Sequence, residues 1–177
     1  IGGELINIAK KTAKGHFFVS PSHKLDMVQD NTVDVVVCIL ALQNIEKLNE
    51  TISEVRKKLV KNGKFIIVLN HPAFRIPKKT SWGWEGDAQY RRVDAYMSES
   101  STEIDMTPGK EEDKINTVSF HRPLQVYFKM LAKNGFAVTK LEEWISHKIS
   151  QEGPKKAEED RMRKEIPMFL MIEGKII

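Results

Sequence analysis

The sequence has 177 residues, of which 41% are hydrophobic, a composition that predicts one folded domain and argues against intrinsic disorder. Its 28 basic and 24 acidic residues leave a net charge of +4 spread along the chain, so no nucleic-acid-binding stripe is indicated. The single cysteine, Cys38, excludes an internal disulfide, and no signal peptide or membrane span is evident. We therefore expect a cytoplasmic protein.

The first part of the chain predicts a helix, a short strand and a polar connection. Apolar residues share one helical face over Glu4–Ala13, and Gly15 can end the helix. His16–Val19 is a strand candidate that stops at the turn Ser20-Pro21-Ser22. The polar connection then leads to the most regular part of the sequence.

The clearest pattern is a strand, a helix and a second strand ahead of Pro72. The apolar run Val35–Leu42 is too short to span a membrane and predicts a strand covered on both faces. Apolar residues then recur every three or four positions over Ile45–Leu59, which predicts an amphipathic helix ended by Asn62-Gly63. Phe65–Leu69 is the second buried strand.

This strand-helix-strand unit predicts an α/β fold, because such crossovers are nearly always parallel and right-handed. Ligands of α/β sheets bind outside the carboxyl ends of the strands. The segments to examine are therefore Leu40–Asn44 and Asn70–Arg75.

An insertion of about residues 73–119 follows, with no convincing long helix or strand. It holds several aromatic residues, among them Trp82, Trp84 and Tyr90. A long aromatic segment directly after a strand is typical of a lid over a substrate, although a flap that only packs on the core fits as well.

Regular patterns return in the last third of the chain. A helix is predicted from Pro123 to Asn134-Gly135, and Phe136–Ile145 is a further strand. Gln151–Glu165 predicts a loop with an exposed helix, and Pro167–Gly174 predicts a final buried strand. We expect residues 1–177 to form a single domain.

Three segments together resemble class I S-adenosylmethionine-dependent methyltransferases of the type 11 group. They are QDNTVDVVVCILALQNIE, VRKKLVKNGKFIIVLNHP and FHRPLQVYFKMLAKNGFAVTKLEEW. In that order, they are similar to the family's signature leading into its fourth strand, to its fifth strand with the helix before it, and to its sixth strand with the helix before it. The resemblance implies a Rossmann-like sheet of order 3-2-1-4-5-7-6 with strand 7 antiparallel.

The sequence also departs from this family. No Gly-x-Gly-x-Gly occurs, although the family's first strand ends in that turn, and Ile1-Gly2-Gly3 stands where the second strand would end. The first two strands are therefore expected to be missing. A longer protein, a fragment, or a rearranged sheet with strand exchange between molecules would each account for this.

The resemblance implies S-adenosylmethionine as cofactor and a set of contacts to it, without a metal. The expected cofactor-binding residues are Ser22, His23, Leu40, Ala41, Leu42 and Asn44. Methyl transfer needs alignment of donor and acceptor and, for some acceptors, a base, for which His71 and His121 are candidates. Both histidines could instead cap local structure. Metal binding has no support, because no cluster of ligands has the required spacing.

Substrate contacts are expected from Trp82, Trp84, Arg122 and Glu143, with packing, a local ion pair or an exposed strand end as the alternatives. The leading hypothesis is methyl transfer to a small-molecule or lipid-like acceptor, with a homo-oligomer or strand exchange compensating for the missing strands. A noncatalytic fragment or interaction subunit of the same fold, and a nucleotide-binding oxidoreductase, are the two alternative functions.

Overall fold

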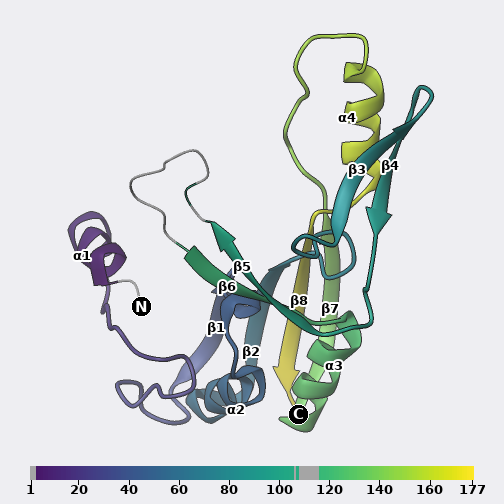
Figure 1. Ribbon diagram of the computed structural model, residues 1–177. Coiled ribbons are helices and arrows are strands. Elements are labelled where there is room, and N and C mark those ends of the chain that lie inside the picture. The colour runs from purple at the N-terminus through teal and green to yellow at the C-terminus, as the bar shows by residue number, and fades with distance from the viewer. Residues whose placement is uncertain (1–2, 106, 108–115) are drawn as a thin grey trace.

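The structure is a computed structural model that describes residues 3–105, 107 and 116–177. Its centre is a four-stranded sheet in the order β1-β2-β8-β7. The strands are β1 (Val33–Ile39), β2 (Leu59–Asn70), β7 (Phe136–Trp144) and β8 (Phe169–Ile176). β1 is parallel to β2, whereas β8 is antiparallel to both β2 and β7 (Figure 1). The predicted α/β class is confirmed.

The core lies between this sheet and the helices α2 (Leu48–Lys58) and α3 (Leu124–Lys133). Ile52 of α2, Leu131 of α3 and Ile67 of β2 are fully buried in one cluster. Both helices present apolar residues at intervals of three or four, so each buries one stripe against the sheet. The predicted helices and the predicted strands β7 and β8 are confirmed to within a few residues.

The prediction that the first apolar strand is covered on both faces was wrong. Val36 and Cys38 of β1 pack against the core, whereas Val35, Val37 and Ile39 are 44%, 54% and 62% exposed. Successive side chains of a strand point to opposite faces. Because α2 and α3 pack on one face only, the other face of β1 stays open.

The expected helix end at Asn62-Gly63 was also wrong. α2 stops at Lys58, and Asn62, with φ of +64°, lies four positions later within the span of β2. A side chain at Gly63 would place its Cβ 2.9 Å from the carbonyl oxygen of Val60. The pair therefore makes a tight bend that leads into Phe65 rather than a helix cap.

The segment before β1 contains the helix α1 (Gly3–Thr12) but no strand at His16–Val19. A strand needs a neighbour to bond with, and no strand of the described part pairs with these residues. The segment is instead held to α2 through Ser22 and Leu25, which bond to Thr51 and Glu54. Ile1 and Gly2, which the resemblance places at the end of a second strand, lie outside the described residues.

The insertion is more regular than its sequence predicts, because it forms two β-hairpins. They are β3 (Thr80–Glu85) with β4 (Ala88–Val93) and β5 (Ser100–Asp105) with β6 (Asn116–His121). Residues 106 and 108–115 of the insertion lie outside the described residues. In Figure 1 the β3–β4 hairpin stands beside helix α4 (Lys156–Glu165) beyond one end of the sheet. None of the described helices is long and apolar enough to cross a membrane.

Candidate functional site

The candidate site lies at the edge of the sheet where β1, β2 and β7 end and β8 begins. The antiparallel placement of β8 between β2 and β7 brings these four strand ends together. Backbone bonds fix them: the amide of His71 donates to the carbonyl of Met168 at 3.0 Å, and the amide of Met168 donates to Trp144 at 2.9 Å. This is the edge at which α/β folds bind ligands.

A cavity of about 330 Å³ opens at the end of β1. Its walls are mostly apolar and come from all four strand ends. They are formed by Ile39, Leu40, Val68, Trp144, Ile145, Ser146, His147 and Phe169. We call it the apolar cavity.

Leu40 lies in this wall with an unusual backbone. Its φ is +51°, in the left-handed region, which costs a residue other than glycine about 1–2 kcal/mol. The conformation is held by two hydrogen bonds, from the Leu40 amide to the Val68 carbonyl and from Nε2 of Gln43 to the Leu40 carbonyl, both 2.8 Å. Backbone strain of this kind often marks a functional position.

A second cavity of about 300 Å³ adjoins the first, because Ser146 and Phe169 line both. It is lined by Arg75, Trp82, Ser146, Lys148, Arg163, Met168 and Phe169. Three of these side chains are cationic and none is acidic. We call it the basic cavity.

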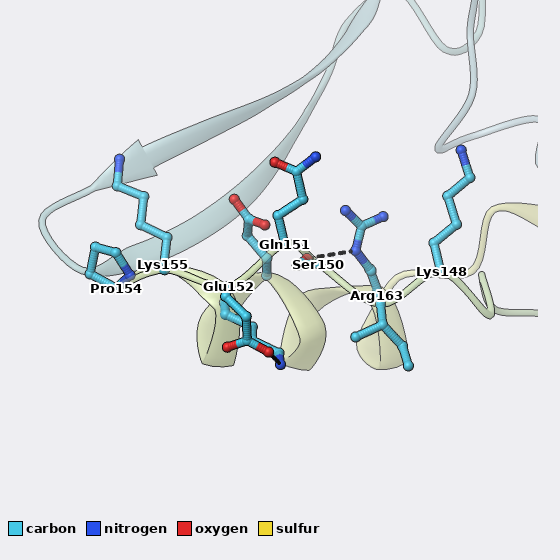
Figure 2. A pocket seen from close by; sticks show the side chains of 11 residues that line it. Lys148, Ser150, Gln151, Glu152, Pro154, Lys155 and Arg163 are labelled. Atoms are coloured by element: carbon cyan, nitrogen blue, oxygen red, sulfur yellow. Dashed lines mark hydrogen bonds and ion pairs between the residues drawn. The ribbon is translucent and has the colours of Figure 1, made fainter.

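Helix α4 and the loop before it form the outer wall of the basic cavity. Figure 2 shows a neighbouring pocket of about 600 Å³ on this loop and helix, in which Lys148, Gln151 and Arg163 extend toward the same side. The Nε of Arg163 donates to the hydroxyl of Ser150 at 3.1 Å, and the amide of Ser150 donates to Asp160 at 2.8 Å. These bonds hold the loop against α4 and keep Lys148 close to Arg163.

The β3–β4 hairpin forms the opposite wall. Arg91 donates from Nε and Nη2 to the carbonyl of Phe74, at 2.9 and 2.6 Å, and its guanidinium lies 4.9 Å from the centre of the Trp82 ring. Lys155 lies over the ring of Trp84 at 4.5 Å. Trp82 thus reaches the basic cavity as a predicted substrate contact would, whereas Trp84 packs between the hairpin and the loop before α4.

His71 and Glu143, both predicted as site residues, are in direct contact. Nδ1 of the buried His71 accepts the amides of Ala73 and Phe74, at 3.2 and 3.3 Å. The proton must therefore reside on Nε2, which donates to Oε1 of Glu143 at 2.8 Å. Both ring nitrogens are engaged, so His71 caps the turn after β2, the alternative that the sequence left open.

His121 and Arg122 are buried and bonded to backbone groups. Nε2 of His121 donates to the carbonyl of Tyr96 at 2.7 Å, and Nη2 of Arg122 donates to the carbonyls of Ile45 and Glu46. Nη1 of Arg122 and Oε1 of Gln43 are buried without a partner among the described residues. His121, Arg122 and Gln43 line a cavity of about 20 Å³, which is large enough for one water molecule and too small for a substrate.

Comparisons with known proteins agree with this architecture. A family model described as a methyltransferase domain matches residues 1–67. An S-adenosylmethionine-dependent methyltransferase from Mesorhizobium loti has 19% identity and a TM-score of 0.73 over 98% of this chain and 76% of that one. The chain has a class I methyltransferase fold.

Two further solved structures share the methyltransferase fold. A proposed S-adenosylmethionine-dependent methyltransferase from Listeria monocytogenes has 22% identity and a TM-score of 0.72 over 99% of this chain and 76% of that one. A methyltransferase from Methanosarcina mazei has 14% identity and a TM-score of 0.63 over 99% and 78%. No curated protein matches the chain. At identities this low the likeness establishes the fold, and the acceptor must be argued from the site.

The six residues expected to bind the methyltransferase cofactor do not converge on one cavity of the described part. Leu40 lines the apolar cavity, and its exposed neighbour Ala41 follows. Leu42 is fully buried in the core and exposes no surface to either cavity.

The other expected cofactor contacts are engaged elsewhere or lie away from the cavities. The hydroxyl of Ser22 bonds to that of Thr51 at 2.9 Å, and half-buried His23 follows Ser22 in the segment beside α2. Nδ2 of Asn44 donates to the carbonyl of Val118 at 3.0 Å. These contacts position the loops around β1 and α2.

Sequence reasoning missed the three cations of the basic cavity. Arg75 is the last residue of Asn70–Arg75, one of the two segments selected because ligands bind outside the carboxyl ends of the strands. That rule was the one sequence signal that pointed to Arg75. Lys148 and Arg163 lie in segments whose charges predict only solvent exposure, and no local pattern connects them to Arg75.

Proposed function

We propose that this protein transfers a methyl group from S-adenosylmethionine to a small-molecule or lipid-like acceptor. The observation that carries this proposal is the strained, exposed Leu40 at the wall of an apolar cavity outside the carboxyl end of β1. In this proposal β1, β2, β8 and β7 correspond to strands 4, 5, 7 and 6 of the family order. The donor then lies at the end of β1 and the acceptor in the adjoining basic cavity.

The residues of the apolar cavity fit one side of the donor. Ile39, Leu40 and Val68 offer an apolar surface that would exclude water from the methyl group. The ribose and the amino-acid end of the donor require polar contacts. The sequence contains no Gly-x-Gly-x-Gly, and among the described strands only β2 pairs with β1.

We therefore propose that a strand laid along the open edge of β1, supplied by a longer form of this chain, by a homo-oligomer or by strand exchange, provides the remaining contacts. The donor brings an electrophilic methyl group, so the chain has mainly to align the acceptor and keep water out. Glu143 is half-exposed and accepts a hydrogen bond from Nε2 of His71, so its carboxylate is the proposed base for acceptors that must lose a proton.

The open edge of β1 also favours a second function, a noncatalytic interaction subunit of the same fold. Its exposed Val35, Val37 and Ile39 offer an apolar strand to a partner. The two functions differ in whether the folded chain binds the donor.

The test is calorimetric titration of S-adenosylmethionine and S-adenosylhomocysteine into the protein. Micromolar binding of both is expected, together with a loss of at least tenfold in Leu40→Asp, because a carboxylate would be placed in an apolar wall. Met97→Asp is the matched control, since Met97 is 63% exposed and lines neither cavity. Absence of binding by a chain with native circular dichroism would contradict the methyltransferase and favour the interaction subunit.

A further inference from the structure

The basic cavity gathers positive charge from three separate parts of the chain. Arg75 comes from the turn after β2, Lys148 from the loop after β7 and Arg163 from α4. The guanidinium of Arg91 lies behind them, against Trp82 in the hairpin wall. A fold that brings separate cations to one cavity raises the positive potential there.

The lining of the basic cavity offers these cations no acidic partner. Within the described part, Arg75, Lys148 and Arg163 make no ion pair, and no residue lining the cavity is acidic. Asp160 accepts the amide of Ser150, and the positive charge of Arg163 contributes to lowering the pKa of the Asp160 carboxyl.

Arg75 is half-buried, as is Arg163, whereas Lys148 is exposed. The guanidinium of Arg75 lies 5.0 Å from the centre of the Phe169 ring, and burial lowers the pKa of Arg75. Its charge also contributes, after burial, to a lowered pKa of Arg91. An anion placed among Arg75, Lys148 and Arg163 would be attracted by all three charges.

The remaining walls suit a flat ligand body. Trp82 and Phe169 contribute aromatic side chains and Met168 a flexible apolar one. Phe169 also lines the apolar cavity, so a ligand that contacts it lies next to the proposed position of the methyl donor.

We infer that the methyl acceptor is an anion with a carboxylate or phosphate group, which Arg75, Lys148 and Arg163 bind while its flat body lies against Trp82 and Phe169. That the bound anion is the methyl acceptor rests on the proposed methyl transfer. The existence of the anion site does not depend on that proposal. Arginine suits such a role because its planar guanidinium donates two parallel hydrogen bonds to carboxylate or phosphate oxygens.

The test uses phenyl phosphate as the probe and benzyl alcohol as its uncharged counterpart, each titrated calorimetrically in the absence of a methyl donor. Phenyl phosphate is expected to bind and to be displaced by inorganic phosphate, and benzyl alcohol is expected to bind at least tenfold more weakly. Equal binding of the two probes would overturn the inference. Absence of phenyl phosphate binding would exclude a soluble anion and leave only an anionic lipid, which the next experiment tests.

Vesicles of phosphatidylcholine with one fifth phosphatidic acid form a second arm that distinguishes a lipid headgroup from a soluble anion. Cosedimentation with these vesicles, and not with pure phosphatidylcholine, would assign the anion to a lipid. Binding in neither arm would leave no anion site.

The variants Arg75→Gln and Arg163→Gln are each expected to weaken the binding that is observed by about tenfold or more. Arg75→Lys keeps the charge and loses the paired donors, so its affinity should fall between those of the wild type and Arg75→Gln. Arg92→Gln is the matched control, because Arg92 is exposed on β4, lies 3.9 Å from Asp94 and does not line the cavity. Equal loss in Arg92→Gln would reveal a nonspecific effect of net charge and overturn the site.

Titration of S-adenosylmethionine into the same variants separates the two proposals. Donor binding without anion binding would refute the anion site and leave methyl transfer standing. Anion binding without donor binding would refute the methyltransferase and leave the anion site standing.

Discussion

Nε2 of His71 lies 2.8 Å from Oε1 of Glu143, which joins the turn after β2 to the end of β7 across 72 positions of sequence. The same ring accepts two backbone amides of the turn that carries Arg75. One buried imidazole therefore determines where a cation of the basic cavity stands.

Replacing His71 by alanine should lower the free energy of unfolding by about 1–3 kcal/mol, because two amides of a buried turn lose their acceptor. Glu143→Gln should cost about 1 kcal/mol or less, since this side chain is half-exposed and its amide oxygen still accepts the Nε2 proton. Urea unfolding followed by circular dichroism measures both. Equal costs in the two variants would show that the hydrogen bond to Glu143, and not the turn cap, is the important contact.

Arg91→Gln should loosen the β3–β4 hairpin from the turn after β2. The guanidinium donates to the Phe74 carbonyl and to Oγ1 of Thr80, so its removal should lower the free energy of unfolding by about 1–3 kcal/mol. Limited proteolysis near Gly86 at the hairpin tip should be faster than in the wild type. Arg92→Gln, next along β4, should be cleaved at the wild-type rate. Equal cleavage of all three proteins would show that Arg91 does not anchor the hairpin.

Glu54 makes the stability depend on pH. Hydrogen bonding from Lys57 is the main reason why the pKa of this buried carboxyl falls from 4.5 to about 2. A carboxyl whose pKa is lower in the folded state stabilises the fold fully above its unfolded pKa, and this contribution is lost as the pH falls toward 2. Glu54→Gln should therefore be less stable than the wild type at pH 7, with a difference that shrinks below pH 4.5.

Urea midpoints between pH 7 and pH 2 measure this difference. The control is Glu50→Gln, because Glu50 is exposed in the first turn of the same helix. A stability difference that stays constant over this range would show that Glu54 has a similar pKa in the folded and unfolded chains.

Self-association through β1 is expected, because this strand pairs only with β2 among the described strands and exposes an apolar face. Val37→Lys places a charge in the middle of that face and should shift the protein toward monomer. Ile8→Lys is the matched control, since Ile8 of α1 is also exposed and lies outside the sheet. Sedimentation velocity over a range of concentrations measures the change. A wild-type protein that is monomeric throughout would refute this association.

Local periodicity was enough to predict the main helices and strands. Ile52 and Leu131 recur in step with their helical neighbours, and Phe65–Leu69 is a continuous apolar run, so each pattern matches a buried surface. The open face of β1 could not be predicted in this way. Whether a helix covers Val37 depends on the packing of distant segments. The residues of the strand itself do not indicate it.

The hairpins and the basic cavity were beyond prediction for related reasons. The sequence TSWGWEGDAQYRRV lacks regular apolar alternation, because its side chains pack against α4 and the turn after β2 rather than into a core. Arg75, Lys148 and Arg163 meet only after β7, β8 and α4 are in place. Cationic residues that come from distant segments have no regular sequence spacing from which a shared site could be predicted.

The position of β8 has a consequence for how the molecule forms during synthesis. β8 is the latest strand in the sequence, yet it lies between β2 and β7 and bonds to both. While the ribosome still holds residues 169–176, β2 and β7 have no strand to join them. The unit from β1 to β2 can pair as soon as it emerges, but the floor shared by the two cavities must wait until residues 169–176 have also emerged.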